Sequence, residues 1–384
     1  MLAEVFQFLI YIPIEWLVGL QTRKVEIEKG ACLLIRLDAI GDYVLFRNFV
    51  RAFKDSEKYR DVRVTLVGNQ AWKDLALVLD EKYFDGYIWI DRNKFVWNIF
   101  YRYRKLKELR SNGWEYVISP RHSREAFFED AIVRIVKGVH KIGTIGDLAI
   151  IRKWQQWFGN RYYTQLMVPR PGIMFEFGRN KEFFEWLLRG QTHINKPEIT
   201  VGDYVAALPI KLPTHYVVVY IGGSAPFRKW SVANHAKVAR YVADKYHSQI
   251  VLCGPMPSDD EDVKFADVFK GNYWDCLGKT TFNDLIGIIG GADLIISNET
   301  FIPHLAVGLG KKVVVISNGN HYGRFTPYPS EITNKYWGVY HPLIENMAHD
   351  YKCLSDTYGQ GSRLNINAVV PSRVMAIVDV AMSA

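Results

Sequence analysis

The sequence predicts an α/β protein built from two doubly wound domains. Two series of short apolar runs, each typical of a buried strand, alternate with stretches of helical periodicity. The first series comprises residues 32–37, 63–67, 86–90 and 116–119, and the second comprises residues 216–220, 248–253, 294–297 and 313–317. Strands that alternate with helices form parallel sheets through right-handed crossovers. The 384 residues also exceed what one hydrophobic core usually serves, so two domains are expected.

A proline-rich stretch separates the two series and sets the domain boundaries. It contains Pro169, Pro171, Pro197, Pro209 and Pro213, and its one helical pattern covers residues 179–189. We therefore divide the chain into an apolar N-terminal segment (1–24), a first domain (25–175), a linker (176–213), a second domain (214–350) and a C-terminal tail and helix (351–384).

The composition is that of a globular protein with an anionic partner. Hydrophobic residues make up 49% and charged residues 23% of the chain, values that exclude extended disorder. The formal net charge of +8 favours a membrane surface, a nucleic acid or a phosphorylated substrate as partner. The four cysteines show no C-x-x-C spacing, which indicates a reducing compartment and disfavours a zinc site.

The N-terminal segment is almost entirely apolar from Leu2 to Leu20. It lacks the basic start and the small-residue cleavage site of a secretory signal. Glu4, Glu15 and Pro13 interrupt it, which argues against a membrane-spanning helix. We expect an interfacial helix that lies on a membrane, and the alternative is a helix packed on the domain surface.

The region of residues 92–110 is basic, and its arginines and lysines alternate with aromatic residues. This pattern suits single-stranded nucleic acid and suits a lipid interface equally well. A solvated helix face with a buried aromatic side is the alternative. We regard nucleic-acid binding as the least favoured of the three.

The first candidate site residue follows the strand-like run at 32–37. Gly41 and Asp42 form a turn there, and apolar residues then recur at helical spacing from Tyr43 to Phe53. Ligands of open α/β sheets bind beyond the carboxyl ends of the strands. Asp42 is therefore expected at the edge of such a site.

The second candidate site follows the strand-like run at 216–220. Gly222, Gly223 and Ser224 lead there to Arg228 and Lys229. Glycines after a strand let backbone N–H groups approach an anion, and two cations suit a diphosphate. The alternative is a surface turn, with the tryptophan that follows packed under the next helix.

The third candidate site follows the run at 294–297. Asn298 and Thr300 are typical helix caps before the proline at 303, whereas Glu299 and His304 are expected at the same cleft as the Arg228 loop. The acidic run 260–262 resembles an Asp-x-Asp metal site. We instead assign it to the acids favoured at a helix N-terminus, so no metal is expected.

Taken in order, the three motifs resemble glycosyltransferase family 9, the ADP-heptose:lipopolysaccharide heptosyltransferases. They are Arg-Leu-x-x-Ile-Gly-Asp, then Gly-x-Ser-x-x-x-Arg-Lys-Trp, then Ser-Asn-Glu-Thr-x-x-x-His-Leu-Ala-x-x-Leu-Gly-Lys-x-Val. The resemblance covers residues 31–329. It implies a GT-B fold, in which two Rossmann-like domains face each other across a cleft, the first binding the acceptor and the second a nucleotide-sugar.

The resemblance also implies roles for the site residues. The catalytic acid of the family falls on Asp42, and its phosphate-binding lysine falls on Arg228. The family's Asp-Thr-Gly-x-x-His loop falls on 299–304, where Glu299 replaces the aspartate and Phe301 replaces the glycine. A side chain at 301 is expected to narrow the approach to the diphosphate, and to be incompatible with a glycine-only backbone angle. Arg36, Asp38 and Arg121 are the candidates for the acceptor side.

These implications define the expected function. It is inverting, metal-independent transfer of a sugar, with ADP-heptose as the favoured donor and no cofactor, onto lipopolysaccharide or another cell-surface glycan. The protein is expected in the cytoplasm, at the inner face of the cytoplasmic membrane. The alternatives are a nucleotide-sugar 2-epimerase of the same fold and a non-catalytic nucleotide-sugar-binding homologue.

Overall fold

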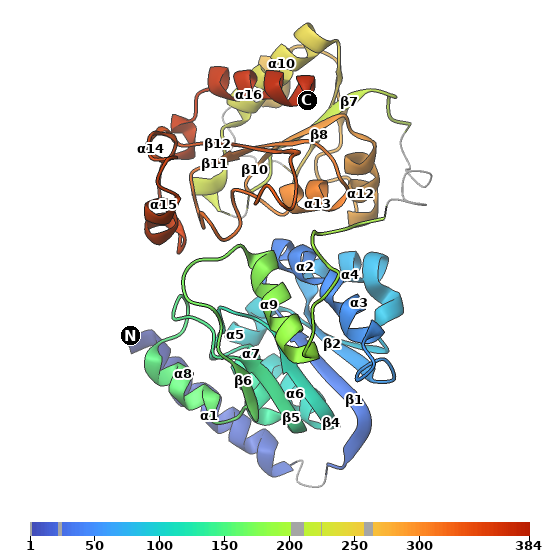
Figure 1. Cartoon of the computed structure of the whole chain (residues 1–384), viewed down its shortest axis with the longest axis vertical. Helices are drawn as coiled ribbons and strands as arrows, with labels where there is room; N and C mark the ends of the chain where they lie inside the picture. Colours follow the sequence, from blue (N-terminus) through green and yellow to red (C-terminus); the bar gives the residue numbers. More distant parts are fainter. Residues whose placement is uncertain (1, 22–24, 201–210, 224, 257–263) are drawn as a thin grey trace. The chain divides into compact units, whose positions relative to one another are not determined.

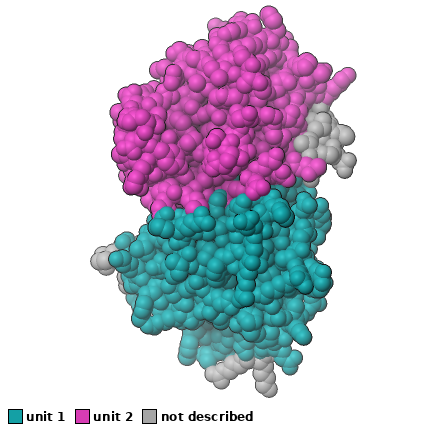
Figure 2. Space-filling view, viewed as in Figure 1, with its two compact units in different colours: residues 1–171, 178–194 teal, residues 172–177, 195–384 magenta. Residues whose placement is uncertain are grey.

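The computed structural model describes residues 2–21, 25–200, 211–223, 225–256 and 264–384. The chain forms two compact units (Figures 1 and 2). Unit 1 comprises residues 1–171 and 178–194, and unit 2 comprises residues 172–177 and 195–384. The two-domain α/β prediction is confirmed.

Unit 1 contains a parallel six-stranded sheet in the order β3-β2-β1-β4-β5-β6. Its strands are β1 (Ile27–Arg36), β2 (Arg63–Asn69), β3 (Gly86–Ile90), β4 (Gly113–Ser119), β5 (Lys137–Thr144) and β6 (Gln165–Met167). Its helices are α1 (Leu2–Gln21), α2 (Ile40–Phe46), α3 (Asn48–Asp55), α4 (Lys73–Asp80), α5 (Arg92–Trp97), α6 (Ile99–Arg110), α7 (Glu129–Ile135), α8 (Lys153–Asn160) and most of α9 (Glu176–Leu188).

Unit 2 repeats this plan, with strand order β12-β11-β10-β7-β8-β9. Its strands are β7 (Tyr216–Tyr220), β8 (Gln249–Cys253), β9 (Trp274–Asp275), β10 (Leu294–Asn298), β11 (Val313–Ser317) and β12 (Tyr336–Tyr340). Its helices are α10 (Val232–Tyr246), α11 (Phe265–Phe269), α12 (Phe282–Gly291), α13 (Ile302–Gly308), α14 (Pro342–Asn346), α15 (Tyr351–Tyr358) and α16 (Pro371–Ser383).

In both units the chain order of the strands reverses between two central neighbours, β1 and β4 or β7 and β10. These switch points are where doubly wound sheets bind ligands.

The structure departs from two of the expected boundaries. Residues 178–194, expected as linker, belong to unit 1, because α9 buries Phe183 and Phe184 and Phe184 stacks on Phe49. The C-terminal segment is part of unit 2, because α16 buries Val374 and Val378 in its core. Residues 201–210 of the expected linker lie outside the described residues.

The N-terminal segment forms the helix α1, which continues through Pro13, so this proline interrupts the apolar run of the sequence but not the helix. One side of α1 packs on unit 1 and buries Tyr11, Ile14 and Val18, as the alternative interpretation expected. None of the helices within the described ranges has the length and apolarity needed to cross a membrane. Contact with a membrane surface stays a prediction.

The basic region 92–110 forms α5 and α6, but its basic and aromatic side chains are not all placed as the helix-face alternative expected. Arg102 is buried between the rings of Tyr11 and Phe95, whereas Trp97 and Phe100 are about four-fifths exposed. A solvated basic face with a buried aromatic side is therefore wrong for this part of the region. The reason is Glu15 of α1, which supplies a buried carboxylate to Arg102 at 3.3 Å.

Candidate functional site

The site in unit 1 is built at the ends of the two central strands. β1 ends at Arg36, and the chain passes through Asp38 directly into α2. Asp42 lies in the first turn of α2, not in a loop before the helix, and a second helix, α3, continues the pattern that the sequence showed as one. The helix is fixed from behind, because the hydroxyl of Tyr43 donates to Asp80 at 2.6 Å.

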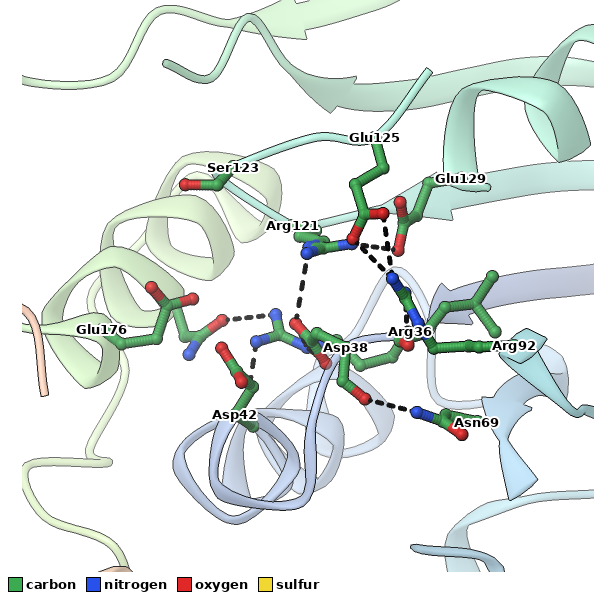
Figure 3. Close-up of polar contacts among 12 residues, drawn as sticks. Arg36, Asp38, Asp42, Asn69, Arg92, Arg121, Ser123, Glu125, Glu129 and Glu176 are labelled. Atoms are coloured by element: carbon green, nitrogen blue, oxygen red, sulfur yellow. Dashed lines mark hydrogen bonds and ion pairs between the residues drawn. The ribbon is translucent and has the colours of Figure 1, made fainter. Parts of the chain in front are cut away.

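Arg36 ties the strand end to its surroundings (Figure 3). Its buried guanidinium donates to the Oδ1 of Asp38 at 2.9 Å and to the Oδ1 of Asn180, on α9, at 2.9 Å. A longer bond of 3.4 Å reaches the backbone carbonyl of Asp42. Arg36 therefore positions the backbone on which the candidate catalytic acid stands.

Arg121 lies just beyond the neighbouring strand, β4, and is surrounded by carboxylates (Figure 3). It approaches Glu125 at 2.5 Å, Glu129 at 2.8 Å and Asp38 at 3.9 Å. Burial alone would lower the pKa of Arg121, but these three acids and Asp42 outweigh it and raise that pKa well above its ordinary value. Arg121 is therefore charged at any functional pH.

The carboxylates of this cluster differ in their response. Burial would raise the pKa of Glu125, but Arg121 and Arg92 outweigh it and hold that pKa below its ordinary value. Burial dominates at Glu129 and raises its pKa. Arg92 also donates to the carbonyl of Leu37, so the cluster reaches back to the end of β1.

The structure therefore brings together the acceptor-side candidates of the sequence, but it buries them. Arg36 is 0% and Arg121 7% exposed, and Asp38 is 5% exposed. Their charged groups form ion pairs with one another and with Glu125 and Glu129. These residues hold the shape of the strand ends, and Asp42 is the candidate with a partly exposed side chain.

The site in unit 2 has the same position, between the ends of β7 and β10. Asn298, the last residue of β10, donates to the carbonyl of Gly222 at 3.0 Å and accepts from the backbone N–H of Trp230 at 3.3 Å. The interpretation of Asn298 as a helix cap was wrong, because its side chain joins two loops. Gly222 is required there, since a Cβ would lie 2.5 Å from the ring of Tyr220.

Arg228 and Glu299 form the charged centre of this site. The guanidinium of Arg228 donates to the backbone carbonyl of Glu299 at 2.9 Å and to its Oε1 at 3.1 Å. The other carboxylate oxygen of Glu299 accepts from the hydroxyl of Ser317 at the end of β11. Burial raises the pKa of Glu299, and Arg228 opposes that rise. Lys229 is exposed beside this pair.

The remaining residues of the third motif lie at the start of α13. The hydroxyl of Thr300 accepts from the backbone N–H of Ile302 at 3.2 Å, so Thr300 is a local cap as one interpretation expected. Phe301 has φ −74° and ψ −17°, an ordinary helical conformation, so no glycine-only angle is needed. Its ring contacts those of Tyr220 and Phe282, with centroids 6.0 and 5.9 Å away.

His304 is buried, and its Nδ1 lies 2.7 Å from the hydroxyl of Tyr328. Burial and the nearby charge of Arg228 lower its pKa to about 3. His304 is therefore neutral at functional pH and does not add positive charge to the site.

Ser224 of the expected site lies outside the described residues, and so does the acidic run 260–262, at which no metal was expected. Across the ranges that are described, no cluster of three or more His, Cys, Asp or Glu side chains is arranged to hold a metal ion.

Comparison with known proteins places this arrangement in a family. The sequence model of glycosyltransferase family 9 (heptosyltransferase) matches residues 102–337, more than half of the chain. The chain belongs to glycosyltransferase family 9. The resemblance seen in the three motifs is thereby confirmed. No match was found among curated protein sequences.

Solved structures show the same fold as this family 9 glycosyltransferase. They include E. coli heptosyltransferase WaaC with ADP-2-deoxy-2-fluoro heptose, at 14% identity and a TM-score of 0.65 over 91% of this chain and 99% of that one. A family 9 glycosyltransferase from Veillonella parvula has 14% identity and a TM-score of 0.67, covering 94% and 99%. E. coli ADP-heptose lps heptosyltransferase II has 13% identity and a TM-score of 0.59, covering 92% and 98%. At such identities the likeness establishes the GT-B fold.

Sequence reasoning missed the residues that support the site. Glu125 and Glu129 follow Arg121 at intervals of four, a spacing that signals ion pairing on a helix, although residues 121–128 lie in the loop before α7. Asn180 and Ser317 carry no such signal, because their partners, Arg36 and Glu299, lie 144 and 18 residues away along the chain.

Proposed function

We propose that this chain is an inverting, metal-independent glycosyltransferase. It moves a heptose or a related sugar from a nucleotide-diphosphate donor to lipopolysaccharide or another cell-surface glycan. The observation that carries the proposal is the position of the family 9 motifs, which lie at the switch point of each sheet, with an acid in unit 1 and cations in unit 2. ADP-heptose is the proposed donor, because structures of WaaC contain ADP and an ADP-heptose analogue.

In this mechanism Asp42 is the general base. The acceptor hydroxyl oxygen forms a bond to the anomeric carbon while the bond from that carbon to the diphosphate oxygen breaks. Attack comes from the face opposite the leaving group, and the hydroxyl proton passes to the carboxylate of Asp42. Arg36 supports this role by binding the backbone carbonyl of Asp42, and the fixed helix α2 limits the movement of its side chain.

The residues of unit 2 stabilise the leaving nucleoside diphosphate. Negative charge develops on the departing oxygen, and fixed positive groups lower the barrier most where that charge appears. Arg228, Lys229 and backbone N–H groups between Thr300 and His304 supply this stabilisation without a cofactor. Glu299 accepts a hydrogen bond from Arg228 and holds it in place. As the replacement for the family's aspartate, Glu299 also binds the sugar hydroxyls in this proposal.

A lipid-linked acceptor requires that the enzyme reach the membrane. We therefore include in the proposal a peripheral contact with the anionic inner face of the cytoplasmic membrane. The net charge of +8 and the exposed apolar residues of α1 support this contact.

The experiment that tests the proposal is the substitution Asp42→Asn. We expect sugar transfer to fall by a factor of about 10² to 10⁴, the usual contribution of a general base, while ADP binding is unchanged. Asp74→Asn is the matched control, because Asp74 is an exposed acid in the first turn of another helix, α4. Transfer by Asp42→Asn at the wild-type rate would exclude Asp42 as the base, and a product that retains the donor's anomeric configuration would exclude inversion.

A further inference from the structure

The outer side of α1 carries apolar residues where a surface helix normally carries polar ones. Tyr11, Ile14 and Val18 are buried against unit 1, whereas Leu9 and Trp16 are about two-thirds exposed. Pro13 and Leu17 are exposed on the same outer row, at helical spacing from Leu9. A helix that is apolar on all sides belongs in an environment that covers both faces.

The segment 148–162, which contains α8, continues this apolar surface and adds positive charge. Trp154 and Trp157 are 40% and 61% exposed, and Leu148 and Ile150 are also exposed. The segment has no acidic residue and three basic ones, Arg152, Lys153 and Arg161, all of them exposed. The guanidinium of Arg161 lies 3.4 Å from the ring centre of Trp157.

The junction of α5 and α6 adjoins α1 and adds further exposed aromatic residues. Trp97 is 80% and Phe100 82% exposed there. α1 contacts both neighbours, since Phe8 packs on Trp154 with ring centres 5.3 Å apart and the hydroxyl of Tyr11 donates to the carbonyl of Val96 at 2.5 Å. Figure 1 shows α8 and α1 side by side in unit 1. We call this surface the α1–α8 face.

We propose that the α1–α8 face docks on an anionic lipid bilayer. Four of the five exposed tryptophans among the described residues lie on it, and tryptophan is the residue most typical of the membrane–water interface. Basic residues among the tryptophans complement anionic headgroups, and the absence of acids from 148–162 removes the opposing repulsion. The inference deepens the membrane contact of the proposed function and rests on that function for its biological role.

Point variants test the face better than deletion of α1. Deletion would leave Arg102 and Arg134 buried without Glu15, which contacts them at 3.3 and 2.9 Å, and unit 1 would lose stability. The apolar variant carries Trp97→Gln, Phe100→Gln and Trp157→Gln, all at positions more than half exposed. The basic variant carries Lys153→Gln and Arg161→Gln.

The measurement is flotation of the full chain with vesicles of phosphatidylcholine alone or mixed with phosphatidylglycerol. We expect binding to the mixed vesicles that weakens as salt is added. The basic variant should lose at least tenfold in binding, because each basic residue near an anionic surface contributes about fivefold. The apolar variant should lose at least tenfold as well, because it removes three exposed aromatic side chains from the membrane–water interface. The matched controls are Leu343→Gln and Lys237→Gln, exposed residues of unit 2, which should bind as wild type. Circular dichroism confirms that each variant is folded.

The outcomes separate this proposal from the proposed function. Vesicle binding that both variants retain, or equal binding to neutral and anionic vesicles, would overturn the docking surface. Self-association that the same variants abolish, without vesicle binding, would assign the face to a second copy of the chain instead. Transfer to a soluble acceptor is measured in parallel. A protein that binds vesicles as expected but transfers no sugar would refute the proposed function and leave the docking surface standing.

Discussion

Arg228 is the residue on which diphosphate binding in the proposed donor site mainly depends. Its guanidinium is fixed by two acceptors on Glu299, so a diphosphate would meet a cation that is already oriented. We expect Arg228→Gln to weaken ADP binding by about ten- to hundredfold, since a hydrogen bond to a charged group contributes about 1.5–3 kcal/mol. Arg228→Lys should lose less, because it keeps the charge. Titration calorimetry with ADP measures both, and unchanged affinity in Arg228→Gln would remove this residue from the donor site.

A buried histidine makes the stability of unit 2 dependent on pH. Burial lowers the pKa of His235 from 6.5 to about 4, and its Nε2 lies 3.2 Å from the Oδ1 of Asn298. Because the unfolded chain binds the proton first, the free energy of unfolding should fall as pH drops from 6.5 towards 4, by about 1.4 kcal/mol per pH unit. His235→Gln should remove about 2 kcal/mol of the loss between pH 6.5 and about pH 5.

Urea unfolding at the two pH values measures this effect. The control is His349→Gln, at an exposed position, which should leave the pH dependence as in wild type. An equal loss of stability in wild type and His235→Gln would show that this histidine is not responsible. His304 and His321, with pKa values of about 3 and 4 for the same reason, should account for part of what remains.

At the residue scale, the sequence predicted the residues that belong to motifs and missed those that support them. The positions of Asp42 and Arg228 beyond strand ends followed from apolar runs that end in polar loops. The role of Asn298 could not be predicted, because a side-chain amide at a strand end is compatible with both a cap and a bond to a distant loop. The accessibility of Arg36 was equally hidden, since its partner Asn180 belongs to a segment expected as linker.

At the scale of elements, α1 shows how one buried carboxylate anchors a helix through two ion pairs. Glu15 is 6% exposed and contacts Arg102 at 3.3 Å and Arg134 at 2.9 Å. Burial lowers the pKa of Arg102 to about 10 despite this carboxylate, so it remains charged at neutral pH. We expect Glu15→Gln to destabilise unit 1 by about 3 kcal/mol, because two buried guanidiniums lose their counter-charge.

Denaturant unfolding followed by tryptophan fluorescence tests this prediction. Asp55→Asn is the control, because Asp55 forms an exposed pair with Arg51 and such pairs contribute less than about 1 kcal/mol. If Glu15→Gln and Asp55→Asn changed the free energy of unfolding equally, the anchoring of α1 would have to come from its apolar residues alone.

The strands that the sequence missed lie at or beside the edges of the sheets, although the edge strand β3, whose sequence is apolar, was found. β6, β9 and β12 are edge strands of their sheets, and β5 is the neighbour of an edge. Their residues are only partly buried, as the pattern of β12 shows, so they do not form the apolar runs by which the inner strands were found. The inner strands β7 and β11 consist almost entirely of buried residues and were predicted with the observed bounds, whereas β1 was predicted over its buried part and its exposed first residues were missed.

At the scale of the whole molecule, the two units repeat one topology with different loops. Each has strand order 3-2-1-4-5-6 when its own strands are numbered in sequence, and each places its polar residues at the switch point. Unit 1 surrounds its arginines with carboxylates, whereas unit 2 leaves Lys229 exposed next to the Arg228–Glu299 pair. An anionic nucleotide should therefore bind unit 2 and not unit 1.

Nucleotide binding by unit 2 and not by unit 1 can be measured with the intact chain. A ligand that binds only the native state raises stability by RT ln(1 + [L]/Kd), about 2.7 kcal/mol at a hundredfold excess over Kd. We expect ADP to raise the unfolding temperature more than UDP, GDP or dTDP do, because ADP-heptose is the proposed donor. Hydrogen exchange should then show protection of the backbone after β7 and at the start of α13, and no change around β1 and β4 in unit 1. If ADP instead protected the strand ends of unit 1, the assignment of the donor and acceptor sides would be reversed. If UDP raised the unfolding temperature more than ADP does, a uridine nucleotide-sugar would replace ADP-heptose as the proposed donor.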